Sequence, residues 1–240
     1  VIALAPESLG TSNTNRTTSN MEFDHVVSQA VLRKGRVFFT LFSTDLEKIQ
    51  RVIDICIKNG RRVALIGRKT QRIVNIAIER EYLKMPKDKL VNLKFRDELI
   101  TNEDSDLAVI ITGARHEPFF MLQRMCNGQD RLLQLIKSDE VVILTPPIPG
   151  TERIAARTLG IVLEHGVKLS QLSKESLRSA HANPSNLKML YSMLKPKYII
   201  PIIGEYRHQY QQKNVALDAG YNSSNIIILE NGQICEFENG

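Results

Sequence analysis

Short apolar runs alternate with amphipathic stretches along most of the chain. The apolar runs occupy residues 36–42, 62–66, 107–112 and 141–145, with a shorter candidate at 89–93. The four longer runs are nearly continuous, which is typical of strands buried on both faces of a parallel sheet. Because helical stretches join these runs, the pattern predicts the α/β class, with a mostly parallel sheet covered by helices on both faces.

The amphipathic stretches carry apolar residues at the 3.6-residue spacing of a half-buried helix. The clearest stripe follows the first apolar run and consists of Leu46, Ile49, Val52, Ile53, Cys56 and Ile57. A second stretch carries Ile73, Ile76 and Ala77, and further helices are predicted through 120–125 and 154–163. Two more helices are predicted to begin at Pro184 and at Tyr206.

Cap and turn residues predict where several elements begin or reverse. Asn20 is the predicted N-cap of a first long helix, and Thr44 with Glu47 predicts a capping box at the next one. Near the end of the chain, Asn231-Gly232 predicts the type I′ turn of a closing hairpin, because both residue types tolerate positive φ.

Composition and charge narrow the functional classes. The chain has 32 basic and 26 acidic residues, a net charge of +6 and a pI near 9.2, which slightly favours a polyanionic partner. Cys56, Cys126 and Cys235 are far apart and odd in number, which argues against a disulfide framework and for a reducing, cytoplasmic compartment. No apolar run approaches the ~18 residues of a membrane span, so we expect no membrane segment.

Nucleotide and zinc fingerprints are missing from the sequence. The stretch GRKT at 67–70 lacks the glycine five positions earlier that a phosphate-binding P-loop requires, and no GxGxxG occurs. No HxH, HxxxH or HExxH occurs either, so the chain alone does not assemble a histidine-rich zinc site. A small-molecule α/β enzyme is therefore a weak alternative.

Two loops carry candidate chemistry. In parallel α/β sheets, ligands collect where strands end. After one predicted strand, Gly113 leads to Arg115, His116 and a helix start at Pro118, which predicts an anion or phosphate cradle, with a solvated turn as the alternative. His181, between small residues in SAHANP, is placed for general acid–base chemistry, or else caps or packs the helix that follows.

Four blocks, taken with their order and spacing, carry a family resemblance over nearly the whole chain. They are VFFTLFSTDLEKIQRVIDICIKNGRRVALIGR, VIITGARHEPFFMLQRMCNG, PPIPGTERIAARTL and SAHANPSNLKMLYSMLKPKYIIPIIGEYRH. Together they resemble ribonuclease J, of the β-CASP branch of the metallo-β-lactamase superfamily. The resemblance implies that residues 1–18 end a first metallo-β-lactamase segment plus linker, that 19–175 form the β-CASP domain, and that 176–240 are the returning metallo-β-lactamase segment.

The resemblance implies RNA processing or degradation by a 5′ exo- or endoribonuclease with two zinc ions. The family's HxHxDH motif would precede Val1, so we identify the chain as a fragment of a divergent member. Glu7 stands where the family has a ligand aspartate, and Ile203 where its P-x-H-G-E-Y-R block has a ligand histidine. Since an alkyl group has no lone pair, we expect zinc binding to be reduced or absent, with Glu7 as the remaining metal candidate. Whether the protein is an enzyme stays open.

The resemblance also implies roles for individual residues. His181 matches the β-CASP histidine that reaches the scissile phosphate, and is the catalytic candidate. Asp45 replaces a family asparagine and would repel RNA phosphate. The RNA-binding candidates are Arg115, His116, Arg178, Ser179, His181 and Arg207. Expected partners are RNA and a ribonuclease J, in a homo- or hetero-oligomer. The alternative function is a non-catalytic RNA-binding or scaffold subunit of an active ribonuclease J complex.

Overall fold

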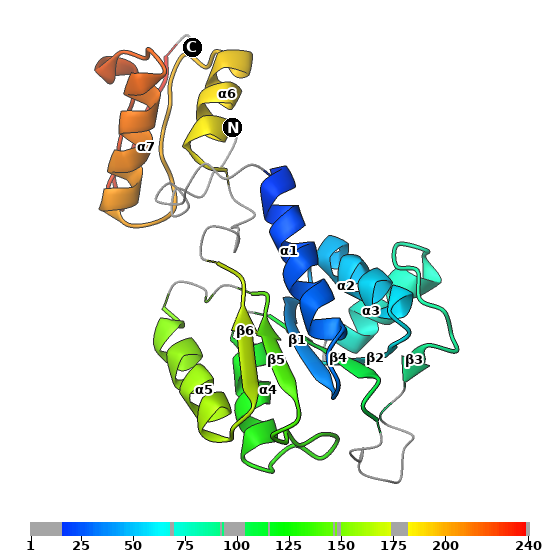
Figure 1. Ribbon diagram of the computed structural model, residues 1–240. Helices are drawn as coiled ribbons and strands as arrows, with labels where there is room; N and C mark the ends of the chain where they lie inside the picture. The colour runs from blue at the N-terminus through cyan, green and yellow to red at the C-terminus, as the bar shows by residue number, and fades with distance from the viewer. Residues whose placement is uncertain are drawn as a thin grey trace. The chain divides into compact units, whose positions relative to one another are not determined.

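The computed structural model describes residues 16–67, 70–91, 93, 104–114, 116–145, 147, 150–173 and 182–238. These residues belong to two compact units, a larger one within 16–173 and a smaller one within 182–238. The larger unit holds a parallel sheet with the strand order β3-β2-β4-β1-β5-β6, which runs from right to left in Figure 1. The predicted α/β class with a parallel sheet is confirmed.

The elements follow the predicted alternation closely. The strands are β1 (Val37–Phe42), β2 (Arg62–Ile66), β3 (Leu90–Val91), β4 (Leu107–Gly113), β5 (Glu140–Ile143) and β6 (Lys168–Gln171). The helices of the larger unit are α1 (Arg16–Val31), α2 (Leu46–Lys58), α3 (Thr70–Glu79), α4 (Glu117–Cys126) and α5 (Glu152–Glu164). Strand β1 is central and pairs with β4 from Val37↔Ala108 to Phe42↔Gly113.

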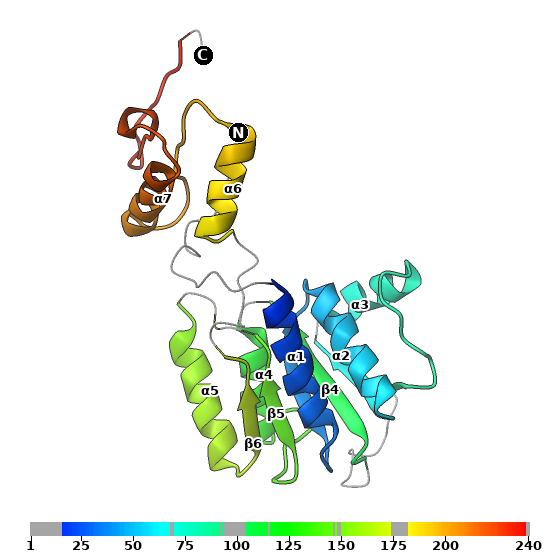
Figure 2. The ribbon, with the colours of Figure 1, turned by 45° about the horizontal axis from the view of Figure 1, so that its top comes forward.

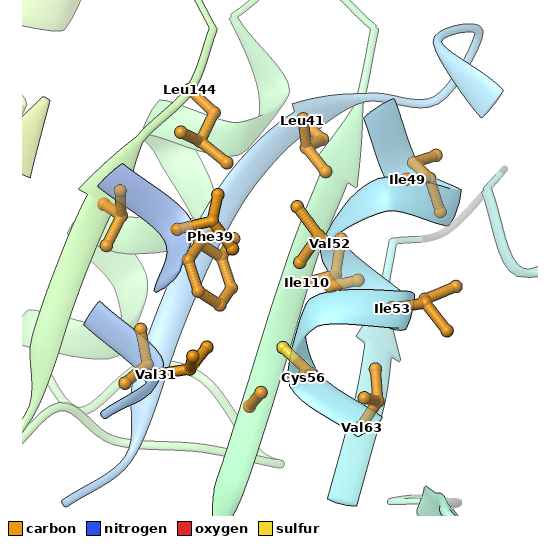
Figure 3. Close-up of a cluster of buried hydrophobic side chains, with 14 of the residues drawn as sticks. Val31, Phe39, Leu41, Ile49, Val52, Ile53, Cys56, Val63, Ile110 and Leu144 are labelled. Atoms are coloured by element: carbon orange, nitrogen blue, oxygen red, sulfur yellow. The ribbon is translucent and has the colours of Figure 1, made fainter. Parts of the chain in front are cut away.

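Helices cover both faces of the sheet because the strand residues are apolar on both sides. Phe39 packs in one core with α1, α2 and α3, while its neighbour Phe38 packs in a second core with α4 and α5. Figure 3 shows the first core, where Ile49, Val52 and Ile53 of α2 lie against the sheet. The predicted stripe of α2 is therefore confirmed, and burial of these side chains is the main force that holds the helix on the sheet.

The predicted face of α3 is partly wrong. Val74 and Ala77 are buried, whereas Ile73 and Ile76 are 37% and 47% exposed. The helix is short and lies at the β3 edge of the sheet, where less of its surface is covered.

The predicted helix starts are also partly wrong. Helix α1 begins at Arg16, so Asn20 lies inside the helix and is not its N-cap. Helix α2 is capped by Asp45, whose carboxylate accepts from the Lys48 amide at 3.2 Å, rather than by Thr44. A carboxylate at this position stabilises the helix N-terminus through both the hydrogen bond and the macrodipole.

The smaller unit packs two helices against each other. Helices α6 (Pro184–Leu194) and α7 (Tyr206–Asp218) lie side by side in Figures 1 and 2, and both begin where the sequence predicts. Asn183 caps α6 by exchanging side-chain-to-backbone hydrogen bonds with Asn186. The core of this unit consists of Leu187, Tyr191, Ile199, Val215, Ala216 and Ile226.

The closing hairpin is not formed as predicted. In the described residues after the short 3₁₀ helix Ser223–Asn225, no strand is assigned, and Ile199 and Ile226 make an isolated parallel bridge. At the turn, the Gln233 amide donates to the Glu230 carbonyl, and Gly232 has a positive φ of +95° while Asn231 does not. A type I′ turn needs positive φ at both central residues, so this turn is of another type, and no strands flank it in the described residues.

Buried charges hold together the edge where the strands begin. Arg36, just before β1, forms a bidentate ion pair with Asp139, just before β5, at 2.8 and 2.6 Å. Arg61, just before β2, is also buried, and it donates to the carbonyls of Val31, Arg33, Gly35 and Ser105. These two guanidinium groups tie the C-terminal end of α1 and the starts of neighbouring strands into one network.

The ion pair of a third arginine at this edge should make the free energy of unfolding depend on pH. Arg62 donates to Asp106 at 2.6 Å, and this hydrogen bond holds the pKa of Asp106 below its ordinary value. Because the folded-state pKa is lowered, the pair stabilises the fold above the ordinary value of about 3.9, and this contribution is lost as the pH falls through the lowered pKa. Asp106→Asn removes the titrating carboxylate, so we expect the variant to lose less stability in acid than the parent protein. The difference in the free energy of unfolding should be no more than about 1 kcal/mol, because the pair is partly exposed.

Urea denaturation of the parent protein and of Asp106→Asn, at several pH values below and above the ordinary aspartate pKa, measures this effect. The two stability curves should converge as the pH falls. Parallel curves over the whole range would show that the Arg62–Asp106 pair contributes nothing.

Candidate functional site

The sheet has a topological switch point between its two central strands. Strand β1 leads into α2 on one face, whereas its neighbour β4 leads into α4 on the opposite face. The ends of the two strands stay joined, because the Ser43 amide donates to the Gly113 carbonyl at 3.1 Å. Where neighbouring loops diverge in this way, an open parallel sheet forms its usual ligand-binding crevice. Residues 43–45 and 113–117 are therefore the candidate site of the larger unit.

The loop after β4 is closed by its own carboxylate. Glu117 Oε2 accepts from the Ala114 amide at 2.8 Å. The amides of Glu117, Phe119 and Phe120 also donate locally, to the carbonyls of Ala114 and His116. These described amides are thus already occupied at the start of α4. The start of α4 therefore offers few free amides to the anion cradle that the sequence predicts at this loop.

The same arrangement recurs at the neighbouring loop. Glu152, in the first turn of α5, accepts from the Gly150 amide at 2.8 Å. With Asp45 at α2 and Glu117 at α4, three helix N-termini at this edge of the sheet carry an acidic side chain. Each carboxylate satisfies a local amide and offsets the positive end of its helix. This edge consequently attracts phosphate less than three bare helix N-termini would.

Close packing makes Gly113 indispensable to the loop. A Cβ at this position would lie 2.6 Å from Glu117 Cβ and 3.2 Å from Pro118 Cδ. We expect Gly113→Ala to displace Glu117 and to lower the free energy of unfolding by about 1–3 kcal/mol. Gly160→Ala, in the middle of α5 with open space around it, is the matched control and should instead raise stability by up to about 1 kcal/mol.

Chemical denaturation of the two variants beside the parent protein tests this close packing. Equal stability of Gly113→Ala and the parent would contradict it.

The smaller unit contains the second candidate feature, a strained turn before α7. Ile203 has φ of +70° and its side chain is 55% exposed, and Gly204 follows with φ of +85°. Positive φ is a genuine outlier for a β-branched residue, and such outliers cluster at functional sites. The Glu205 amide donates to His208 Nδ1 at 3.1 Å, which pins the first turn of α7 directly after this turn.

The described residues do not fit a zinc ion at this turn. Ile203 presents at this turn an alkyl group that cannot coordinate a metal. Within the part of the chain that the structure describes, no three His, Cys, Asp or Glu side chains are close enough together to hold a metal. Glu7, the other candidate position for a ligand, lies outside the described residues.

Neither buried cysteine of the sheet unit offers a nucleophile. Burial raises the pKa of Cys56 to about 12 and that of Cys126 to about 11. Both thiols are therefore protonated at neutral pH, and a protonated thiol is a poor nucleophile and a poor metal ligand. Their role is in the packing of the two cores.

A pocket of about 680 Å³ lies beside the carboxyl end of β2. Thr112 and Glu117, next to the switch point, reach its wall, and most of the remaining wall is apolar, with contributions from Val74, Leu93 and Phe120. No pattern in the sequence predicts this pocket, because its residues come from helices and strands far apart in the chain. Phe120 was predicted on the apolar stripe of its helix, but it is 42% exposed and contributes to the pocket wall instead.

The predicted site residues fall in different places. Glu7, Arg115, Arg178, Ser179 and His181 lie outside the described residues. Two others are described, each within its own unit. His116 is the N-cap of α4 and its ring meets Phe120 edge to face at 4.9 Å, and Arg207 forms an exposed ion pair with Glu205 at 2.8 Å.

Comparison with known proteins places the chain in a family. Residues 34–161, more than half of the chain, match the family model described as the β-CASP domain of ribonuclease J. The chain belongs to the ribonuclease J family. Residues 172–226 of this ribonuclease J family member match a second model, described as a Zn-dependent metallo-hydrolase RNA specificity domain. The resemblance drawn from the four sequence blocks is confirmed.

Relatives of this ribonuclease J family member come from several bacteria. The chain is 29% identical to ribonuclease J2 of Bacillus subtilis over 99% of its own length and 42% of that protein. It is 32% identical to ribonuclease J 2 of Streptococcus pyogenes over 98% of its length and 42% of that protein, and 30% identical to ribonuclease J 1 of the same species over 88% and 38%. The chain thus spans about two fifths of the length of these curated relatives.

None of the helices in the described part of this ribonuclease J family member is long and apolar enough to cross a membrane.

Proposed function

We propose that this chain is part of a ribonuclease J-type protein that processes or degrades RNA. The observation that carries the proposal is the order of two family models, a β-CASP domain followed by an RNA specificity domain, over 34–161 and 172–226. We further propose residues 19–175 as the β-CASP domain, between a metallo-β-lactamase segment that ends near residue 18 and one that returns at 176.

In this proposal, zinc binding by the protein is reduced or absent. The RNA specificity model is described as belonging to a Zn-dependent metallo-hydrolase, which supports zinc in the family. In this chain, however, Ile203 removes a donor atom from a position that the backbone still holds in a strained conformation. Glu7, in place of an aspartate, is the remaining candidate ligand.

RNA binding is assigned to a set of basic and polar side chains. The candidates for phosphate contacts are Arg115, His116, Arg178, Ser179, His181 and Arg207. His181 is in addition the candidate catalytic residue. The excess of 32 basic over 26 acidic residues supports a polyanionic partner. The proposed compartment is the cytoplasm, and the proposed assembly is a homo- or hetero-oligomer with a ribonuclease J.

Salt-dependent RNA binding tests the electrostatic part of the proposal. Each arginine that contacts a phosphate should, when replaced by alanine, weaken binding and reduce the slope of log K against log salt by about one. We expect this of Arg115→Ala and Arg178→Ala in the full-length protein, with exposed Arg80→Ala of the larger unit as control. Slopes that equal the parent slope in both variants would contradict the assignment.

The second candidate function is a non-catalytic RNA-binding or scaffold subunit of an active ribonuclease J complex. Ile203 favours it, because a subunit that no longer cuts RNA is free to lose a zinc ligand. Incubation of the full-length protein with labelled RNA, alone and with a ribonuclease J, distinguishes the two functions. RNA cleavage by the protein alone, abolished by His181→Ala, would exclude the scaffold.

A further inference from the structure

Two exposed tyrosines form a parallel pair on the first turns of α7. The rings of Tyr206 and Tyr210 have centroids 6.4 Å apart and planes inclined by 26°. Their side chains are 62% and 50% exposed, so neither ring is part of the core of the smaller unit. Large aromatic side chains exposed together are unusual on a surface that serves only solubility.

The two rings form one aromatic surface. Their planes are nearly parallel and both residues are largely exposed. Unpaired bases of RNA stack on exposed tyrosine rings. The pair is therefore suited to bases of single-stranded RNA.

Polar groups suited to a nucleotide surround the pair. Arg207, next to Tyr206, forms only an exposed ion pair with Glu205, which is worth little and is readily exchanged for a phosphate. Asn214 is exposed one turn after Tyr210, on the same side of α7. Amide side chains of this kind donate to and accept from the edges of bases.

We propose that Tyr206 and Tyr210 stack bases of a single-stranded RNA on their exposed rings. This inference rests on the proposed function, and it is supported by the match of residues 172–226 to an RNA specificity domain, which includes both tyrosines. Stacking on tyrosine is tolerant of base identity, because every base has a π-face. The pair thus strengthens binding to unpaired RNA without selecting a sequence.

Binding of 5′-phosphorylated oligouridylate to the full-length protein tests the inference. Tyr206→Ala and Tyr210→Ala should each weaken binding by about tenfold, whereas Tyr206→Phe and Tyr210→Phe should keep it within about twofold. The slope of log K against log salt should stay that of the parent, because no phosphate contact is lost. Tyr82→Ala, at a 76% exposed tyrosine of the larger unit, is the matched control and should bind like the parent.

An oligonucleotide made of abasic residues separates stacking from other effects of the substitutions. The parent and both alanine variants should bind this probe equally. An equal loss on both probes, or no loss on oligouridylate, overturns the stacking role and leaves the proposed function standing. Failure of the parent protein to bind oligouridylate at all overturns both.

Discussion

Replacing Arg36 by leucine should lower the free energy of unfolding of the larger unit by about 3–5 kcal/mol. The side chains of Arg36 and Asp139 are 3% and 0% exposed, so water does not screen the pair or replace the lost partner. Arg36 also donates to the Gln134 carbonyl at 2.8 Å. The substitution leaves the Asp139 carboxylate charged, buried and without its cation, and that cost is larger than the gain from an added apolar group.

Two further variants separate the buried charge from simple loss of packing. Arg36→Leu combined with Asp139→Leu should recover a substantial part of the loss, because no uncompensated charge remains. Arg51→Leu, at the partly exposed pair with Asp24, is the matched control and should cost less than about 1 kcal/mol. Urea denaturation measures all three, and a loss in Arg36→Leu no larger than in Arg51→Leu would refute the role of the buried pair.

Ile203→His should raise the zinc affinity of the full-length protein by about 100-fold or more. Outer-shell changes alone alter metal affinity by about 10- to 100-fold, and a direct ligand contributes more. The backbone is already suited to the new residue, because histidine is several-fold enriched at positive φ whereas isoleucine is strained there. The variant should therefore fold at least as stably as the parent.

Ile203→Gly is the control for the strained backbone. Glycine relieves the strain at φ of +70° but supplies no ligand, so its zinc affinity should equal that of the parent. Competition with a zinc chelator measures the affinity of all three proteins. If Ile203→His and Ile203→Gly bind zinc equally, position 203 is not a lost ligand position.

The sheet and its helices are predictable from the sequence because burial on two faces leaves a strong signal. Every residue of β4 is buried, and the stripe of α2 lies on the core as its spacing requires. Strand β6 escaped prediction, because Lys168–Gln171 is a partly exposed strand at the edge of the sheet with little apolar character. A strand with few buried residues leaves no hydrophobic pattern in the sequence from which it could be predicted.

The site is less predictable because it depends on which groups already have partners. Gly113 is followed closely by a predicted helix start, and this order of residues predicts an anion cradle. The order does not reveal that the Glu117 carboxylate accepts a hydrogen bond from the Ala114 amide. The strained φ of Ile203 is likewise invisible in a sequence, whereas its place in the GEYR block pointed to it directly. Local hydrogen bonds at loop ends are decided by geometry that residue types alone do not specify.

The zinc content of the purified full-length protein, measured by elemental analysis after dialysis against a zinc-buffered solution, tests the central claim most directly. A ribonuclease J family member with a degenerate metal site should retain fewer than the two zinc ions per chain that the family resemblance implies, and Ile203→His should retain more than the parent. Two zinc ions per chain in the parent protein, together with RNA cleavage that His181→Ala abolishes, would contradict the claim.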